Sequence, residues 1–218
     1  MKGLLIKDFM LLKNQKSFFI IIVAAAIGMS TLMENSSFII GYIAVIGSLF
    51  TLSTIRYDEF DNGNAFLYTL PITRKDYVYE KYEFGLFTSG ISLLAATVIA
   101  MIADLIKHSV VLTDTIVTAL LTLPVSIILI SFMLPFHLKF EGEKSKYASI
   151  GAIGLIYVIC FAFVKIAELF DIDLITTFNQ FFTMRTMGTL IALAFGIGII
   201  ICLISIKISI NIIHKKDF

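Results

Sequence analysis

The sequence predicts an all-α, polytopic membrane protein with six transmembrane helices, from its composition, its long apolar segments and the placement of its basic residues. Of the 218 residues, 58% are hydrophobic and only 15% are charged, and the mean hydropathy is +0.95. A soluble domain carries about 25% charged residues. Because so few charges cannot cover a soluble globule, most side chains are expected to face lipid or other helices.

Six apolar segments are long enough to cross the hydrocarbon core as helices. About 20 residues are needed, and every backbone amide in the core must find its partner within the helix. The segments are residues 17–33, 37–55, 83–105, 115–138, 147–169 and 188–210. The first is near the lower length limit for a span. Pro124 and Pro135 lie in the fourth, where each removes a backbone hydrogen bond and favours a kink.

Basic residues lie mostly on one side of these expected spans, and this bias predicts the orientation. Fourteen of the 17 lysines and arginines lie before the first span, after the second, after the fourth and at the C-terminal end. The other side has only Lys107, Lys165 and Arg185. Both termini are therefore predicted to be cytoplasmic, and residues 56–82 form the longest expected cytoplasmic loop.

Several function classes receive no support from the residues. A net charge of +1 argues against a nucleic-acid-binding protein, which needs a concentrated basic face. Cys160 and Cys202 lie in apolar runs without a CxxC neighbour, so free thiols are expected rather than a metal site. There is no phosphate-binding GxxxxGK[ST] motif and no HExxH motif. We expect no catalytic residue, metal or cofactor in this chain. The absence of charges near the middle of the spans disfavours an ion-coupled carrier.

The loop at residues 56–82 is more than a tether by composition, since it combines five acidic and four basic residues with aromatic side chains. Pro71 is expected to end an amphipathic stretch. Thr73 is expected to cap a second helix, with Asp76 at its third position. A solvated loop lying on lipid headgroups accounts for the composition equally well.

Two stretches resemble the cytoplasmic loops of type-2 ABC exporter permeases. The first is Asp58-Glu59 followed by Leu70-Pro71-Ile72-Thr73-Arg74-Lys75-Asp76. The second is Leu134-Pro135-Phe136-His137-Leu138-Lys139-Phe140-Glu141-Gly142-Glu143-Lys144. It is similar to a stretch in small permeases of bacitracin, lantibiotic and phenol-soluble-modulin export systems. The insertion of Glu141 before the glycine departs from that pattern.

The resemblance implies roles for three segments of a single permease domain, residues 1–218. Residues 1–16 would form an interfacial elbow helix, residues 56–82 a cytoplasmic coupling helix, and residues 171–187 an extracellular interfacial or re-entrant segment. A hairpin on the outer leaflet is an equal alternative for the last. The helical wheel of the elbow segment is poorly amphipathic, because Phe9 falls between Lys2 and Lys16.

The resemblance also implies the docking residues for an ATPase partner. In the first loop they are Glu59, Gly63, Phe66, Leu70, Pro71 and Arg74. In the second cytoplasmic loop they are Lys139, Phe140, Glu143 and Lys144.

These features lead us to expect the permease subunit of an ATP-driven ABC exporter in the bacterial plasma membrane. Separate ABC ATPase subunits would bind ATP and Mg²⁺, and a second permease chain, identical or different, would complete the pathway through the lipid bilayer. The substrate would be hydrophobic or amphipathic, with a peptide favoured. The alternative is a membrane immunity or structural protein that binds a peptide without transporting it.

Overall fold

The computed structural model describes residues 2–32, 37–60, 63, 67, 69, 71–107, 112–140, 142–169 and 186–216. Within these ranges every regular element is a helix, which confirms the all-α prediction for the part described. The helices are α1 (Lys2–Asn14), α2 (Lys16–Leu32), α3 (Ser37–Glu59), α5 (Arg74–Lys107), α6 (Leu112–Lys139), α7 (Glu143–Leu169) and α9 (Met187–His214).

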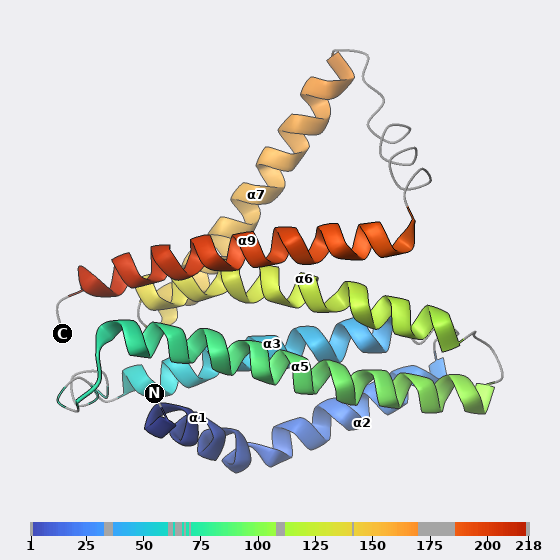
Figure 1. Ribbon diagram of the computed structural model, residues 1–218, viewed down its shortest axis with the longest axis horizontal. Helices are drawn as coiled ribbons and strands as arrows, with labels where there is room; N and C mark the ends of the chain where they lie inside the picture. Colours follow the sequence, from blue (N-terminus) through green and yellow to red (C-terminus); the bar gives the residue numbers. More distant parts are fainter. Residues whose placement is uncertain are drawn as a thin grey trace.

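Helices α3, α5, α6 and α9 form the packed centre of the molecule (Figure 1). The most extensive contacts are those of α6 with α9 and of α3 with α5. Helices α1 and α2 lie along α3 and α5, whereas α7 diverges from the bundle (Figure 1). In lipid, such packing depends on close van der Waals contact and interhelical hydrogen bonds. The main core cluster includes Ile55, Tyr82, Ile130, Leu134 and Ile213.

Four described helices are long and apolar enough to cross a membrane: Ser37–Glu59, Arg74–Lys107, Thr113–Lys139 and Met187–His214. A fifth candidate exists if Gly3–Asn14 and Lys16–Ser30, which meet at a bend of 60°, count as one span. The four correspond to the second, third, fourth and sixth expected spans. A membrane protein with several spans is therefore supported, while the number six and the orientation stay predictions.

Helix α5 begins nine residues before the expected third span. Its 34 residues correspond to a length of about 51 Å at 1.5 Å per residue, against a hydrocarbon core of about 30 Å. The first turns of α5 therefore extend beyond the core. Part of the expected 56–82 loop is thus a rigid extension of a span, anchored by the buried side chains of Tyr77 and Val78.

Candidate functional site

The start of α5 is set by a reciprocal cap between Thr73 and Asp76. The Asp76 backbone N–H donates to Thr73 Oγ1 at 3.1 Å. The Thr73 N–H and hydroxyl donate to Asp76 Oδ2 at 3.2 and 2.7 Å. This arrangement satisfies amides that a helix N-terminus otherwise leaves unbonded. The predicted cap is confirmed, and it fixes where the loop ends and α5 begins.

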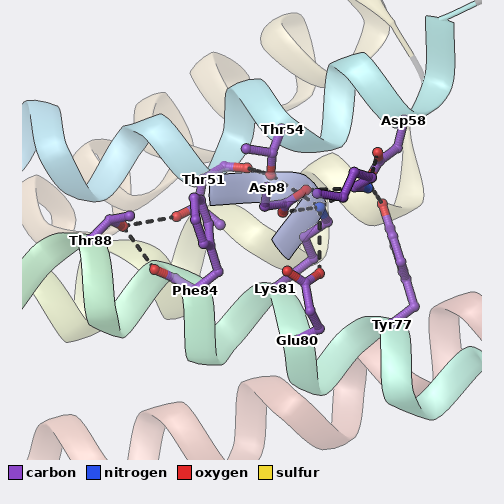
Figure 2. Close-up of polar contacts among 10 residues, drawn as sticks. Asp8, Thr51, Thr54, Asp58, Tyr77, Glu80, Lys81, Phe84 and Thr88 are labelled. Carbon is purple, nitrogen blue, oxygen red and sulfur yellow. Dashed lines mark hydrogen bonds and ion pairs between the residues drawn. The ribbon is translucent and has the colours of Figure 1, made fainter. Parts of the chain in front are cut away.

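About two turns into α5, Lys81 lies at the centre of a buried ionic cluster (Figure 2). Its Nζ is 2.5 Å from Asp8 Oδ2 on α1 and 2.8 Å from Asp58 Oδ2 on α3. It also donates to Thr54 Oγ1 at 3.1 Å. The Lys81 and Asp8 side chains have no exposed surface. A buried charge is tolerated only when it is paired and hydrogen-bonded. Because the partners of Lys81 lie on α1 and α3, the cluster joins these two helices to α5 at one point.

Three further polar groups complete the cluster. Lys7 bonds to Asp58 and lies 3.2 Å from Asp8 Oδ1. The Tyr77 hydroxyl donates to Asp58 Oδ2 at 3.1 Å, and a Glu80 oxygen lies 3.6 Å from Lys81 Nζ. Burial acts to raise the pKa of Asp8, but Lys81 and Lys7 outweigh it and hold that pKa below its ordinary value. Asp8 is therefore charged, as the ion pair requires.

The packing of α1 explains why its helical wheel has no clean apolar face. Phe9 makes edge-to-face ring contacts with Phe84 and Phe87 of α5, with centroids 5.4 and 5.2 Å apart. Its neighbour Asp8 points into the ionic cluster. Because α1 meets α5 through both an aromatic and an acidic side chain, a simple division into polar and apolar faces fails. Residues 2–14 are helical, as predicted for the elbow segment.

Two predicted docking residues bind other parts of the chain at this end of the bundle. Glu59 Oε2 accepts a hydrogen bond from the Gly142 N–H at 2.9 Å, which connects the two predicted docking loops. Gly142 has φ +54°, a backbone conformation that favours glycine. Arg74 Nη1 donates to the carbonyls of Ile213 and His214 at 3.1 and 2.9 Å. Arg74 thus binds the C-terminal end of α9, where unbonded carbonyls favour a cation.

Other predicted docking residues of the first loop have different surroundings. Gly63 lies against the end of α3, where an added Cβ would be 2.7 Å from the Asp58 carbonyl oxygen. Pro71 is exposed. Phe66 and Leu70 lie outside the described residues.

The residues predicted in the second loop lie at the ends of α6 and α7. Lys139 and Lys144 are exposed, and Phe140 is half-buried beneath the Lys139 ammonium, 5.2 Å from its ring centroid. Glu143 begins α7, but its side chain lies outside the described part. The predicted extracellular segment 171–187 also lies outside it, except for its last two residues.

The ionic cluster was not foreseen from the sequence, where Asp58 and Lys81 read as charges of a solvated loop. The sequence feature that could have indicated the cluster was the length of the helix that begins after Thr73. A helix capped at Thr73 that runs into the third span must carry Lys81 along one continuous face with Tyr77. The sequence also did not indicate that the Phe60 side chain is 71% exposed. Phe60 presents an aromatic ring at the end of α3, beside Glu59.

Taken together, these contacts connect residues of the two predicted cytoplasmic loops to α1, α3, α5 and α9. We call this region the loop end; it contains α1, the C-terminal ends of α3, α6 and α9, and the first turns of α5. The ionic cluster, the Glu59–Gly142 bond and the Arg74 bonds together tie it into one unit. Among the described residues, no group of three or more His, Cys, Asp or Glu side chains could hold a metal ion.

Comparison with known proteins identifies the family. Residues 3–214 match the family model described as "ABC-2 family transporter protein". No curated protein and no solved structure matches the chain significantly. The match covers nearly the whole chain, including every helix of the loop end. The chain therefore belongs to the ABC-2 transporter family and is the membrane-embedded permease subunit of an ABC transporter, whose ATPase resides on a partner chain.

Proposed function

We propose that this permease is the membrane half of an ATP-driven exporter with both termini in the bacterial cytoplasm, and that the ATPase docks on the loop end. The observation that carries the proposal is the linkage of both cytoplasmic loops through the Glu59–Gly142 bond. A partner that contacts either loop would displace the other with it. The bias of lysine and arginine supports the cytoplasmic location.

Motion at this surface would reach the spans through rigid connections. Residues before Thr73 lead directly into α5, whose first turns hold α1 and α3 through Lys81. Because Arg74 is hydrogen-bonded to the C-terminal end of α9, a movement of the first turn of α5 would also move that end of α9. ATP binding on the partner would favour one arrangement of these helices and ATP hydrolysis another, because each nucleotide state makes different contacts with the loop end.

Several exposed side chains at the loop end suit a docking surface. Phe60 is 71% exposed. Pro71, Lys75 and Lys144, which belong to the two predicted loops, are exposed as well. Protein interfaces commonly bury a central aromatic side chain within a polar rim. Phe60 therefore joins the docking residues expected from the sequence.

Docking is tested by co-purification of the tagged permease with a co-expressed ABC ATPase subunit. Phe60→Ala should reduce recovery of the ATPase about tenfold or more, as expected for an interface hot spot. The matched control is Phe38→Ala, which removes an aromatic ring 51% exposed at the opposite end of α3. Equal recovery with both variants would contradict docking at the loop end.

For the substrate, we propose a hydrophobic or amphipathic peptide carried outward by two permease chains, identical or different. The support is the family resemblance together with spans that carry few charges. The complex reconstituted in vesicles should hydrolyse ATP faster when the transported peptide is added, and inside-out vesicles should accumulate that peptide. An immunity or structural protein that binds a peptide would retain the peptide without an ATPase partner and without accumulation.

A further inference from the structure

A basic hollow lies between the C-terminal ends of α6 and α9. It has a volume of about 540 Å³ and is lined by Lys139, Ile208, Asn211, Ile212, Lys215 and Lys216. Three of these side chains are ammonium donors and one is an amide. None of the six described lining side chains is acidic, and three of them carry a positive charge.

Two of the lysines are held in place by the fold. Lys216 Nζ donates to the Leu138 carbonyl at 3.2 Å, and the Lys139 ammonium lies 5.2 Å from the Phe140 ring centroid. An ammonium group has three N–H donors, so Lys139 can bind an anion while it contacts the Phe140 ring. Arg74 already binds two carbonyls at the end of α9. It thereby reduces the negative potential that would otherwise oppose an anion here.

The wall of the hollow continues into an apolar surface. Ile208 is 48% exposed, and Ile204, Ile200 and Ile197, which lie on the same side of α9 at helical spacing, are exposed beyond it. A helix face of this kind within a span lies against lipid acyl chains. Basic pockets at the cytoplasmic side of membrane helices bind anionic lipid headgroups. A phospholipid would place its phosphate among the lysines and its acyl chain along α9.

We propose that this hollow binds the phosphate headgroup of an anionic phospholipid of the inner leaflet. The charge of the lining favours an anion, and the adjoining apolar surface favours a lipid over a soluble anion or an acidic peptide. The inference rests on the proposed cytoplasmic location of the loop end, of which the hollow is a part. Its lining includes the expected docking residue Lys139 but neither Glu59 nor Phe60, which carry the docking proposal. Bound lipid would fix α9 against α6 at the loop end.

The experiment uses the purified full chain in detergent and native mass spectrometry to count retained lipids. Phosphatidylglycerol and phosphatidylcholine of the same acyl composition are compared. Wild-type protein should retain phosphatidylglycerol preferentially. Lys139→Gln/Lys215→Gln should lower its affinity about 30-fold, because each basic residue near a lipid surface contributes about one order of magnitude or less. The matched control is Lys13→Gln/Lys16→Gln, which removes two exposed lysines near the junction of α1 and α2.

Retention of the lipid preference in the control and its loss in the test variant would support the site. Size-exclusion profiles establish that both variants are folded. Equal phosphatidylglycerol retention by wild type and Lys139→Gln/Lys215→Gln would overturn the proposal. Displacement of the lipid by excess inorganic phosphate would also overturn it and assign the hollow to a soluble anion. Loss of ATPase co-purification with unchanged lipid retention would assign it to the protein partner instead.

Discussion

Replacing Lys81 with methionine would leave Asp8 and Asp58 buried without their central cation. The two Nζ–Oδ2 distances are 2.5 and 2.8 Å. At an effective dielectric constant of about 20, each pair has a gross attraction of about 6 kcal/mol. Desolvation of the three ions offsets most of this attraction, and removing one partner from a buried ion pair typically costs about 3–5 kcal/mol. Lys7 remains beside both carboxylates, so the expected loss of stability is near the lower end of this range, about 3 kcal/mol.

Thermal unfolding in detergent measures this loss. Cys202 is buried, so a thiol-reactive fluorophore labels it only as the bundle opens; the background variant is Cys160→Ala. For a chain of this length, the expected cost corresponds to a decrease of about 10 °C in the unfolding midpoint. The matched control is Lys13→Met, which removes an exposed lysine and should change the midpoint by no more than about 2 °C.

A compensating variant separates the loss of the ion pair from the loss of lysine packing. Lys81→Met combined with Asp8→Asn and Asp58→Asn removes the charges on both sides. The triple variant should recover at least half of the decrease in unfolding midpoint, since the side chains at positions 8 and 58 are no longer buried ions. The reasoning is refuted if Lys81→Met unfolds within about 2 °C of the parent protein. It is also refuted if the triple variant is no more stable than Lys81→Met alone.

Three further predictions concern the same midpoint. Gly47→Ala should cost about 1–3 kcal/mol, because its Cβ would lie 1.8 Å from a serine hydroxyl of α5. Gly41→Ala, with no atom within 4 Å, should not destabilise, and equal effects would contradict the close contact. Tyr82→Phe removes bonds of 2.5 and 2.9 Å with two serine hydroxyls of α9 and should cost about 1–2 kcal/mol; an unchanged midpoint would argue against them. Thr73→Ala should cost about 1 kcal/mol and accelerate amide hydrogen exchange in the first turn of α5, whereas unchanged exchange would contradict the cap.

Local sequence signals succeeded where one helix or one turn decides the outcome. The cap at Thr73 and Asp76 was predicted because both partners lie within four residues of each other. Four expected spans correspond to described helices that are long and apolar enough to cross a membrane, since an apolar run must satisfy its own amides in hydrocarbon. The helical conformation of residues 2–14 was predicted as well, by the resemblance to known permeases rather than by periodicity. Their interfacial role stays a prediction.

The candidate site was predicted only in part, because its contacts join residues far apart in the chain. Lys81 meets Asp8 across 73 positions, and Glu59 meets Gly142 across 83. No local sequence pattern predicts such a pairing. In the sequence, a charged residue near the end of a helix cannot be distinguished as solvated or buried. Residues expected only to face a partner, such as Glu59 and Arg74, proved to bind their own chain.

Amino-acid composition and hydropathy alone determined that this chain is a helical membrane protein, because the requirement to satisfy backbone amides in lipid acts on each segment separately. The family resemblance was also visible there, in two short loops. Only the tertiary structure decided which charges are buried and which loops are joined. Those outcomes depend on distances between helices, and burying an ion is tolerable only where folding brings its partner within a few ångströms.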